Sequence, residues 1–129
     1  MIKMIPIDQY DDQKARRYFD IFPRLIHEQI SVSKVPKAGT LNVWHRHAKQ
    51  TDWFFVVQGK LEVFTLTEDK ILKTYILDNK MPQCLEISPG LYHGWRTLED
   101  STILIYCLSH KHSEDDEERV SYEKMGVKL

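Results

Sequence analysis

The segment at residues 39–59 reads GTLNVWHRHAKQTDWFFVVQG and carries the most informative pattern in the chain. His45 and His47 are separated by one residue, so a β-strand would project both imidazoles to the same face. The apolar run at 53–57 is typical of a second strand. If that strand folds back beside the first, Asp52 comes close to both histidines.

Short strand-like runs continue on both sides of this segment. They are rich in β-branched and aromatic residues, and Gly, Pro, Asn or Asp turn signals separate them. The absence of a helical period between them favours an antiparallel sandwich or barrel over alternating strands and helices. We therefore expect one all-β domain over residues 1–129, with a barrel core at about 27–110 and strands at 29–32, 40–47, 53–57, 61–65, 71–77, 84–87 and 102–108.

The two ends of the chain are less regular. Residues 11–19 are expected to form a short helical turn or a charged arm, and the acidic run at 114–118 a solvated loop or short helix. The N-terminal arm carries Tyr18, Phe19 and Phe22, which have little reason to stay in solvent. We expect a homodimer in which this arm packs on the partner.

Composition narrows the classes of function. The 129 residues include 18 basic and 19 acidic side chains, a balance that gives no broad attraction to nucleic acid or to an anionic membrane. No apolar stretch approaches the roughly 20 residues of a membrane helix. Cys84 and Cys107 stand singly in apolar surroundings, which favours free thiols and a cytoplasmic protein.

The spacing within residues 39–59 resembles the first cupin motif: a glycine, five residues, His-x-His, four residues, an acid, six residues and a glycine. Asp52 stands where the motif usually has Glu. Two residues separate Gly90 from His93, as in the second cupin motif. The resemblance implies a cupin barrel, also called a double-stranded β-helix or jelly roll, with a short N-terminal arm.

Three imidazoles and one carboxylate on a rigid barrel suit a divalent Fe, Mn, Ni, Cu or Zn ion. One interpretation is therefore a metal-dependent mononuclear cupin, an isomerase, dioxygenase or lyase. Its ligands would be His45, His47, Asp52 and His93. The alternative is that these histidines are hydrogen-bonded polar groups of the barrel.

A wider resemblance, over about residues 16–106, is to the dTDP-4-dehydrorhamnose 3,5-epimerases. That family has a Gln-x-Asn-x-Ser strand, a Gly-Val-Leu-Arg-Gly-Leu-His strand, a Pro-x-Gly-Phe-x-His-Gly-Phe turn and a late Tyr. The corresponding segments here are QISVS at 29–33, GTLNVWH at 39–45, ISPGLYHGWRTLEDS at 87–101 and ILIY at 103–106.

The resemblance implies an enzyme that removes a proton next to the C4 ketone of a nucleotide-linked 4-keto-6-deoxy sugar. By position, His45 would be the base and Tyr106 the acid on the opposite face. Imidazole suits this role because its ordinary pKa lies close to the working pH. No cofactor is needed in this interpretation, and the residues expected to contact substrate are Gln29, Arg16, Phe19, His47 and Trp95.

The chain departs from that family at several positions. Asn42 replaces an Arg, Asp52 replaces a Lys and Ile21 replaces a Glu. The Asp that orients the base lies beyond the barrel in longer members, and we expect this chain to be too short to supply it. A carboxylate beside a developing enolate raises the barrier, so Asp52 separates the epimerase from the metal interpretation. A third interpretation is a cupin that binds sugar without converting it.

Overall fold

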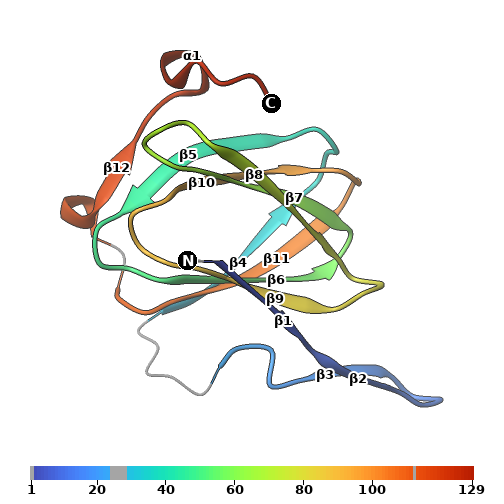
Figure 1. The fold of residues 1–129 in the computed structure, drawn as a ribbon. Coiled ribbons are helices and arrows are strands. Elements are labelled where there is room, and N and C mark those ends of the chain that lie inside the picture. Colours follow the sequence, from blue (N-terminus) through green and yellow to red (C-terminus); the bar gives the residue numbers. More distant parts are fainter. Residues whose placement is uncertain (1, 24–28, 112) are drawn as a thin grey trace.

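The computed structural model describes residues 2–23, 29–111 and 113–129. Its strands form two five-stranded antiparallel sheets that face each other, which confirms the all-β expectation (Figure 1). Position 27, the expected start of the barrel, lies outside the described residues. The first sheet runs in the order β1 (Ile2–Pro6), β9 (Gln83–Ile87), β6 (Asp52–Gln58), β11 (Thr102–Leu108), β4 (Gln29–Val35). The second runs in the order β12 (Glu117–Arg119), β5 (Leu41–His47), β10 (Tyr92–Thr97), β7 (Lys60–Leu66), β8 (Leu72–Asp78).

All seven expected runs fall on strands, and five further strands appear. β2 (Asp8–Asp11) and β3 (Arg16–Phe19) form a hairpin where a helical turn or charged arm was expected. The acidic run begins as a short 3₁₀ helix at Glu114–Asp116, one of the two expected forms, and continues as β12, which was not expected. The polar strands β2, β3 and β12 escaped the sequence analysis because their side chains lack the apolar alternation of a half-buried strand.

The main core lies between the two sheets. It consists of inward-facing apolar side chains from both: Phe54, Val56, Leu61, Val63, Leu77, Leu85, Ile87 and Leu104. β6 is apolar on both faces because both are covered. Its residues Trp53 and Phe55 face away from this core, yet both are buried.

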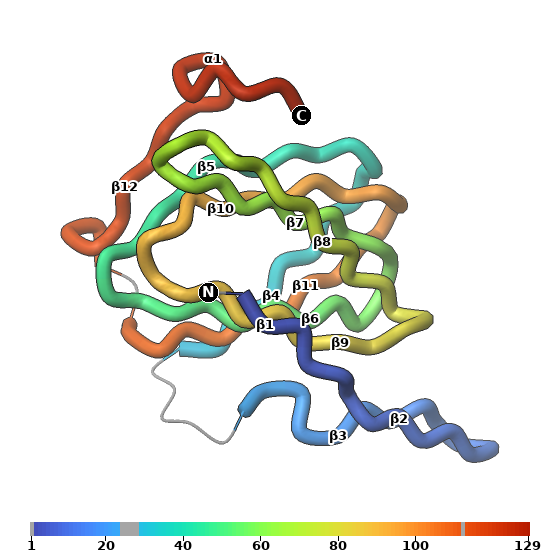
Figure 2. Tube along the Cα trace, in the orientation of Figure 1, coloured from blue at the N-terminus to red at the C-terminus, as the bar shows by residue number. Residues whose placement is uncertain are grey.

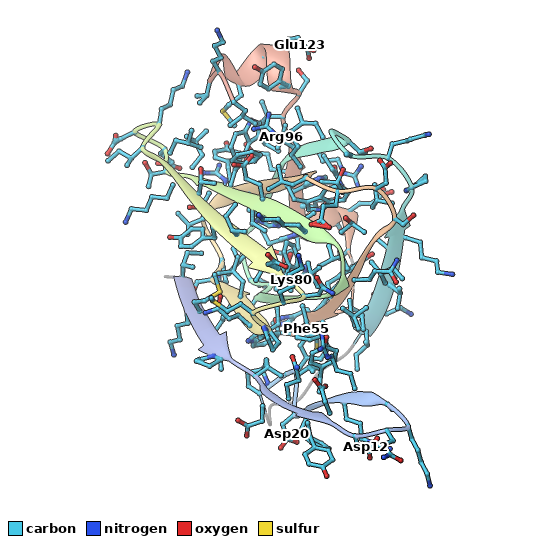
Figure 3. The ribbon with its side chains drawn as sticks, turned by 90° about the vertical axis from the view of Figure 1, so that its right-hand side faces the viewer. Asp12, Asp20, Phe55, Lys80, Arg96 and Glu123 are labelled. Atoms are coloured by element: carbon cyan, nitrogen blue, oxygen red, sulfur yellow. The ribbon has the colours of Figure 1, made fainter. Side chains whose placement is uncertain are left out.

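The N-terminal arm covers that outer face of β6. Ile7, Tyr18 and Phe22 pack with Trp53 and Phe55, and the ring centroids of Tyr18 and Phe55 lie 5.3 Å apart. Figure 3 shows Phe55 toward the end of the barrel from which the Asp12 hairpin extends. Two of the three arm aromatics thus pack on the chain's own barrel.

The C-terminal segment covers the outer face of the second sheet. Helix α1 (Tyr122–Met125) is capped by the Ser121 hydroxyl, which accepts from Lys124 N, and ends at Gly126 with φ of 72°. Met125 is buried against Trp44, together with Phe64 and Leu66. This contact anchors the segment beyond β12.

Cys84 and Cys107 are free and buried. Burial raises the pKa of the Cys84 thiol to about 12 and that of Cys107 to about 11, so both stay protonated. Among the helices of the described residues, none has the length and apolar character needed to cross a membrane.

Candidate functional site

A cavity of about 220 Å³ lies between the sheets, lined by both layers. Figure 2 shows β5 and β10 on one side of the barrel and β6 and β11 on the other. Most of the cavity's polar side chains come from these strands and from β12. Its lining residues are Ser33, Asn42, His45, His47, Gln50, Asp52, Phe54, His93, Gly94, Trp95, Leu104, Tyr106, Leu108, Glu117 and Arg119.

His45 lies on β5 and is one of the lining residues. β5 pairs with β10 so that His45 lies opposite His93, and their ring centroids are 6.2 Å apart. His45 Nε2 is 2.9 Å from Asn42 Oδ1, and Nδ1 is 3.2 Å from Glu117 Oε1. Burial lowers the pKa of His45, with a further contribution from His93, while Glu117 opposes the shift. The imidazole is therefore neutral at pH 7.

A carboxylate that the sequence analysis did not expect, Glu117, lies beside His45. It comes from β12, which pairs with β5 so that Glu117 lies opposite His47 and Arg119 opposite His45. His45 Nδ1 has no well-aligned hydrogen bond to Glu117, so the carboxylate and the neutral ring are in close polar contact, which becomes an ion pair only when the ring is protonated. The only sequence signal for Glu117 is its alternation with Glu118, which faces outward to Arg46.

A second histidine–carboxylate pair lies beside the first. Asp52 Oδ2 is 3.1 Å from His93 Nε2, and Asp52 Oδ1 accepts a hydrogen bond from Gln50 at 2.5 Å. Burial alone would raise the pKa of Asp52, but the hydrogen bonds from His93 and Gln50 and the charge interactions with His93 and His47 hold it below its ordinary value. Gln50 was missed in the sequence because it lies in the β5–β6 loop.

Three of the four residues considered as metal ligands come together. Ligand atoms of His47, Asp52 and His93 lie within 4.8 Å of one another, and all three side chains are buried. His45 is outside this group because its ring is turned to Asn42 and Glu117. Two imidazoles and a carboxylate are a donor set that divalent transition metals accept, so the residues fit such an ion.

The remaining expected site residues divide into two groups. His47, Trp95 and Tyr106 line the cavity, and the Tyr106 ring meets Phe54 edge-on at 6.3 Å. Gln29, Arg16 and Phe19 do not line it. The Gln29 amide donates to Ser31, while Arg16 and Phe19 lie on the β2–β3 hairpin, where Arg16 pairs with Asp11 at 2.9 Å. Their contact with substrate stays a prediction.

Gly94 lets the two histidine strands approach. It follows His93 at an irregularity in the β5–β10 pairing. A Cβ added at this position would collide with the Val43 side chain and with the Asn42 carbonyl. Only glycine therefore allows β10 to hold His93 against β5 in this register.

The His45–Glu117 contact predicts a pH dependence. Because burial lowers the pKa of His45, the ring should gain its proton only below pH 6.5, the ordinary value. The Glu117 carboxylate favours the protonated ring, so Glu117→Gln should lower the pKa of His45 further. NMR titration of the His45 ring carbon-bound proton measures both shifts, and Glu123→Gln on the exposed surface is the matched control. An unchanged or higher pKa in Glu117→Gln would contradict the contact.

Sequence comparison adds one relative to this geometry. No protein-family model matches the chain. The spore coat polysaccharide biosynthesis protein SpsL of Bacillus subtilis (strain 168) is 30% identical over 94 residues. The match covers 66% of this chain and 62% of that protein, so this chain spans less than two thirds of the relative's length.

Structural similarity is more extensive. One similar structure is the dTDP-4-dehydrorhamnose 3,5-epimerase of Bacillus anthracis, solved with TDP and PPi bound. The match covers 94% of this chain and 79% of that chain, with a TM-score of 0.80 and 23% sequence identity. A dTDP sugar isomerase of Desulfovibrio desulfuricans G20 covers 98% of this chain over 89% of its own, at TM-score 0.84 and 18% identity.

A sugar 3,4-ketoisomerase of Thermoanaerobacterium thermosaccharolyticum, solved with TDP, covers 95% of this chain over 89% of its own, at TM-score 0.81 and 15% identity. The resemblance seen in the sequence is thus confirmed at the level of the fold. The chain has the cupin jelly-roll fold of the dTDP-sugar epimerases and isomerases.

Proposed function

We propose that this protein is an enzyme that removes a proton from the carbon next to the ketone of a nucleotide-linked 4-keto-6-deoxy sugar, as the 3,5-epimerases do. His45 is the base and Tyr106 the acid. The observation that carries the proposal is that both side chains line one cavity and that a carboxylate, Glu117, contacts His45 on Nδ1.

The Glu117 contact gives His45 the form that a base requires. A neutral imidazole has one N–H and one lone pair, and an acceptor near Nδ1 favours the tautomer with the proton there. Nε2 then holds the lone pair, so the Asn42 amide, whose Oδ1 lies 2.9 Å from Nε2, has to turn its NH₂ group toward the ring or give way to the substrate. General bases are commonly oriented by a third group in this way.

Asp52 is compatible with this chemistry because neighbouring side chains contact its carboxylate oxygens. Its two oxygens contact His93 and Gln50, and its side chain is almost completely buried. A carboxylate that accepts hydrogen bonds from both sides repels a developing enolate less than an unpaired one. These contacts reduce the repulsion but do not supply the positive charge that the family's Lys would bring.

The named relatives support the same class of substrate. Two of the similar structures carry TDP, and the B. subtilis relative is named for polysaccharide biosynthesis. Epimerisation and a keto shift between C3 and C4 both begin with removal of a proton beside a ketone. We propose epimerisation as the reaction, with ketoisomerisation as the other possible fate of the same intermediate.

The proposal predicts loss of proton exchange in two variants. His45→Asn and Tyr106→Phe should each lower solvent deuterium uptake into a TDP-4-keto-6-deoxy sugar by about 10²- to 10⁴-fold, the usual contribution of a general acid or base. Mass spectrometry of the recovered sugar nucleotide measures uptake, and NMR of the product separates epimerisation from a keto shift.

Matched controls exist for both changes. His110→Asn and Tyr75→Phe alter residues that neither line the cavity nor belong to the β2–β3 hairpin, and both variants should exchange at the wild-type rate. Circular dichroism checks that the fold of each variant is intact. Absence of uptake by the wild-type protein would remove the proposed activity.

We further propose a homodimer, in the cytoplasm, that places the β2–β3 hairpin of one chain near the cavity of the other. β4 is the edge strand of its sheet, and its outward-facing Ile30 and Val32 are 61% and 59% exposed. An edge strand with apolar side chains is a natural place for a second chain to pack. Such packing would give Arg16 and Phe19 a role that they lack within one chain.

Light scattering at micromolar concentration should therefore give the mass of a dimer. Val32→Lys puts a charge on the proposed interface and should shift the protein toward a monomer. Ile71→Lys is the matched control, because Ile71 is 57% exposed but lies on the other sheet's β7–β8 turn. A monomeric wild type, or equal effects of the two changes, would contradict the interface.

The grouping of His47, Asp52 and His93 favours a second candidate, a metal-dependent cupin. A divalent ion held by these residues would act as a Lewis acid on a carbonyl oxygen. His45 and Glu117 would keep their roles at the proton, since neither belongs to this group.

This candidate predicts a particular pattern of metal binding. Elemental analysis of freshly purified protein, and titration with Mn²⁺ or Zn²⁺ followed by thermal unfolding, should show one ion that Asp52→Asn and His93→Ala lose. His45→Asn should retain it, because His45 stands outside the three-residue group. Metal-free wild-type protein without response to added ions would exclude the candidate.

A further inference from the structure

The last strand of the barrel brings a cation to the cavity. Among the residues that line it, all of them described, Arg119 is the only arginine or lysine. It lies on β12 opposite His45, and its side chain is 66% exposed. The same lining holds two carboxylates, Asp52 and Glu117, so Arg119 is its one strong attraction for an anion.

The backbone that carries Arg119 is held firmly. The Asp116 carboxylate accepts hydrogen bonds from the backbone N–H groups of Ala48, Lys49 and Gln50 at 3.0–3.2 Å. On the other side of Arg119, Trp44 and Val120 exchange two backbone hydrogen bonds at 3.0 and 3.1 Å. The strand is thus fixed at both ends, while the guanidinium reaches the mouth of the cavity.

The guanidinium retains capacity for a ligand. Its Nε–H donates to Glu117 Oε2 at 2.9 Å, and this is the one hydrogen bond that the described residues give it. An arginine has five N–H donors in a planar fork, an arrangement that matches the oxygens of a phosphate group. The contact with Glu117 orients the fork without using its terminal nitrogens.

The other arginines of the described residues are committed elsewhere. Arg46 faces outward and pairs with Glu68 and Glu118, and Arg96 pairs with Glu62. Arg16 and Arg17 pair with acidic residues of their own hairpin. None of the four lines the cavity.

The size of the cavity places the anion at the mouth. Sites that bury most of a drug-sized ligand enclose about 300–1,000 Å³. At about 220 Å³ this cavity accepts only part of a nucleotide sugar. With the sugar ring against His45, the phosphates would lie outside, on the side where Arg119 is exposed.

We propose that Arg119 binds the diphosphate of the substrate, so that β12 supplies both the partner of the base and the anion site. The proposal rests on the proposed function for the identity of the ligand as a nucleoside diphosphate sugar. The site itself recognises the phosphate oxygens, which pyrophosphate and TDP share. Thymidine lacks phosphates, so it serves as the negative control in the binding experiments.

Calorimetric titration with TDP and with pyrophosphate tests the site directly. Arg119→Gln should weaken both by about 10- to 100-fold, as expected for loss of charge-assisted hydrogen bonds. Arg119→Lys should lose less, because it keeps the charge but not the fork. Arg96→Gln is the matched control, since Arg96 is also an arginine paired with a carboxylate, Glu62, but does not line the cavity, and it should bind like the wild type.

Glu117→Gln separates binding from a structural role. If Arg119 only held Glu117 in place, either change would weaken pyrophosphate binding equally. If Arg119 binds the anion, Glu117→Gln removes a competing negative charge, and pyrophosphate should bind as well as or better than to the wild type. Equal weakening by the two variants overturns the inference, as does wild-type affinity in Arg119→Gln.

The outcomes also separate the inference from the proposed function. TDP binding that is unchanged in Arg119→Gln overturns the anion site and leaves the proposed substrate class in place. Pyrophosphate binding that depends on Arg119 supports the anion site. If TDP then binds no more tightly than pyrophosphate, the thymidine group contributes nothing, and the nucleotide specificity of the proposed function is removed.

Discussion

The antiparallel pairing of β5 with β10 on one edge and β12 on the other is the constraint on which the site depends. One register sets His93 opposite His45, and the other sets Glu117 opposite His47 and Arg119 opposite His45. Because side chains alternate along each strand, these residues project together into the cavity. A slip of one residue in either pairing would turn its charged groups to the outer face.

This constraint explains which parts of the site the sequence could predict. The spacing of His45 and His47 specifies a shared face whatever the partners of β5 are, so their convergence follows from strand geometry. Glu117 could not be predicted, because its place depends on pairing between segments about 70 residues apart. Within an acidic run, the alternation of inward Glu117 and outward Glu118 resembles an ordinary charged surface.

Burial of polar groups distinguishes this site from the rest of the core. Asp52 and His93 are buried among apolar side chains, where an unpaired carboxylate would cost several kcal/mol. Their 3.1 Å contact and the Gln50 hydrogen bond offset that cost. The same pairing brings Asp52 into one group with His47 and His93. Sequence alone could not decide between the two interpretations, since it does not show which groups the Asp52 carboxylate contacts.

The two termini complete the barrel in different ways. The N-terminal arm closes the outer face of β6 through Tyr18 and Phe22, but within one chain its Arg16 stays at the hairpin. The C-terminal segment closes the outer face of the second sheet through Met125 and also extends that sheet by one strand. An added edge strand directs every second side chain toward the interior. The path of the C-terminal backbone therefore both covers the barrel and brings Glu117 and Arg119 to the cavity. The placement of Glu117 and Arg119 is therefore coupled to the anchoring of Met125, which lies 32 residues after His93 in the chain.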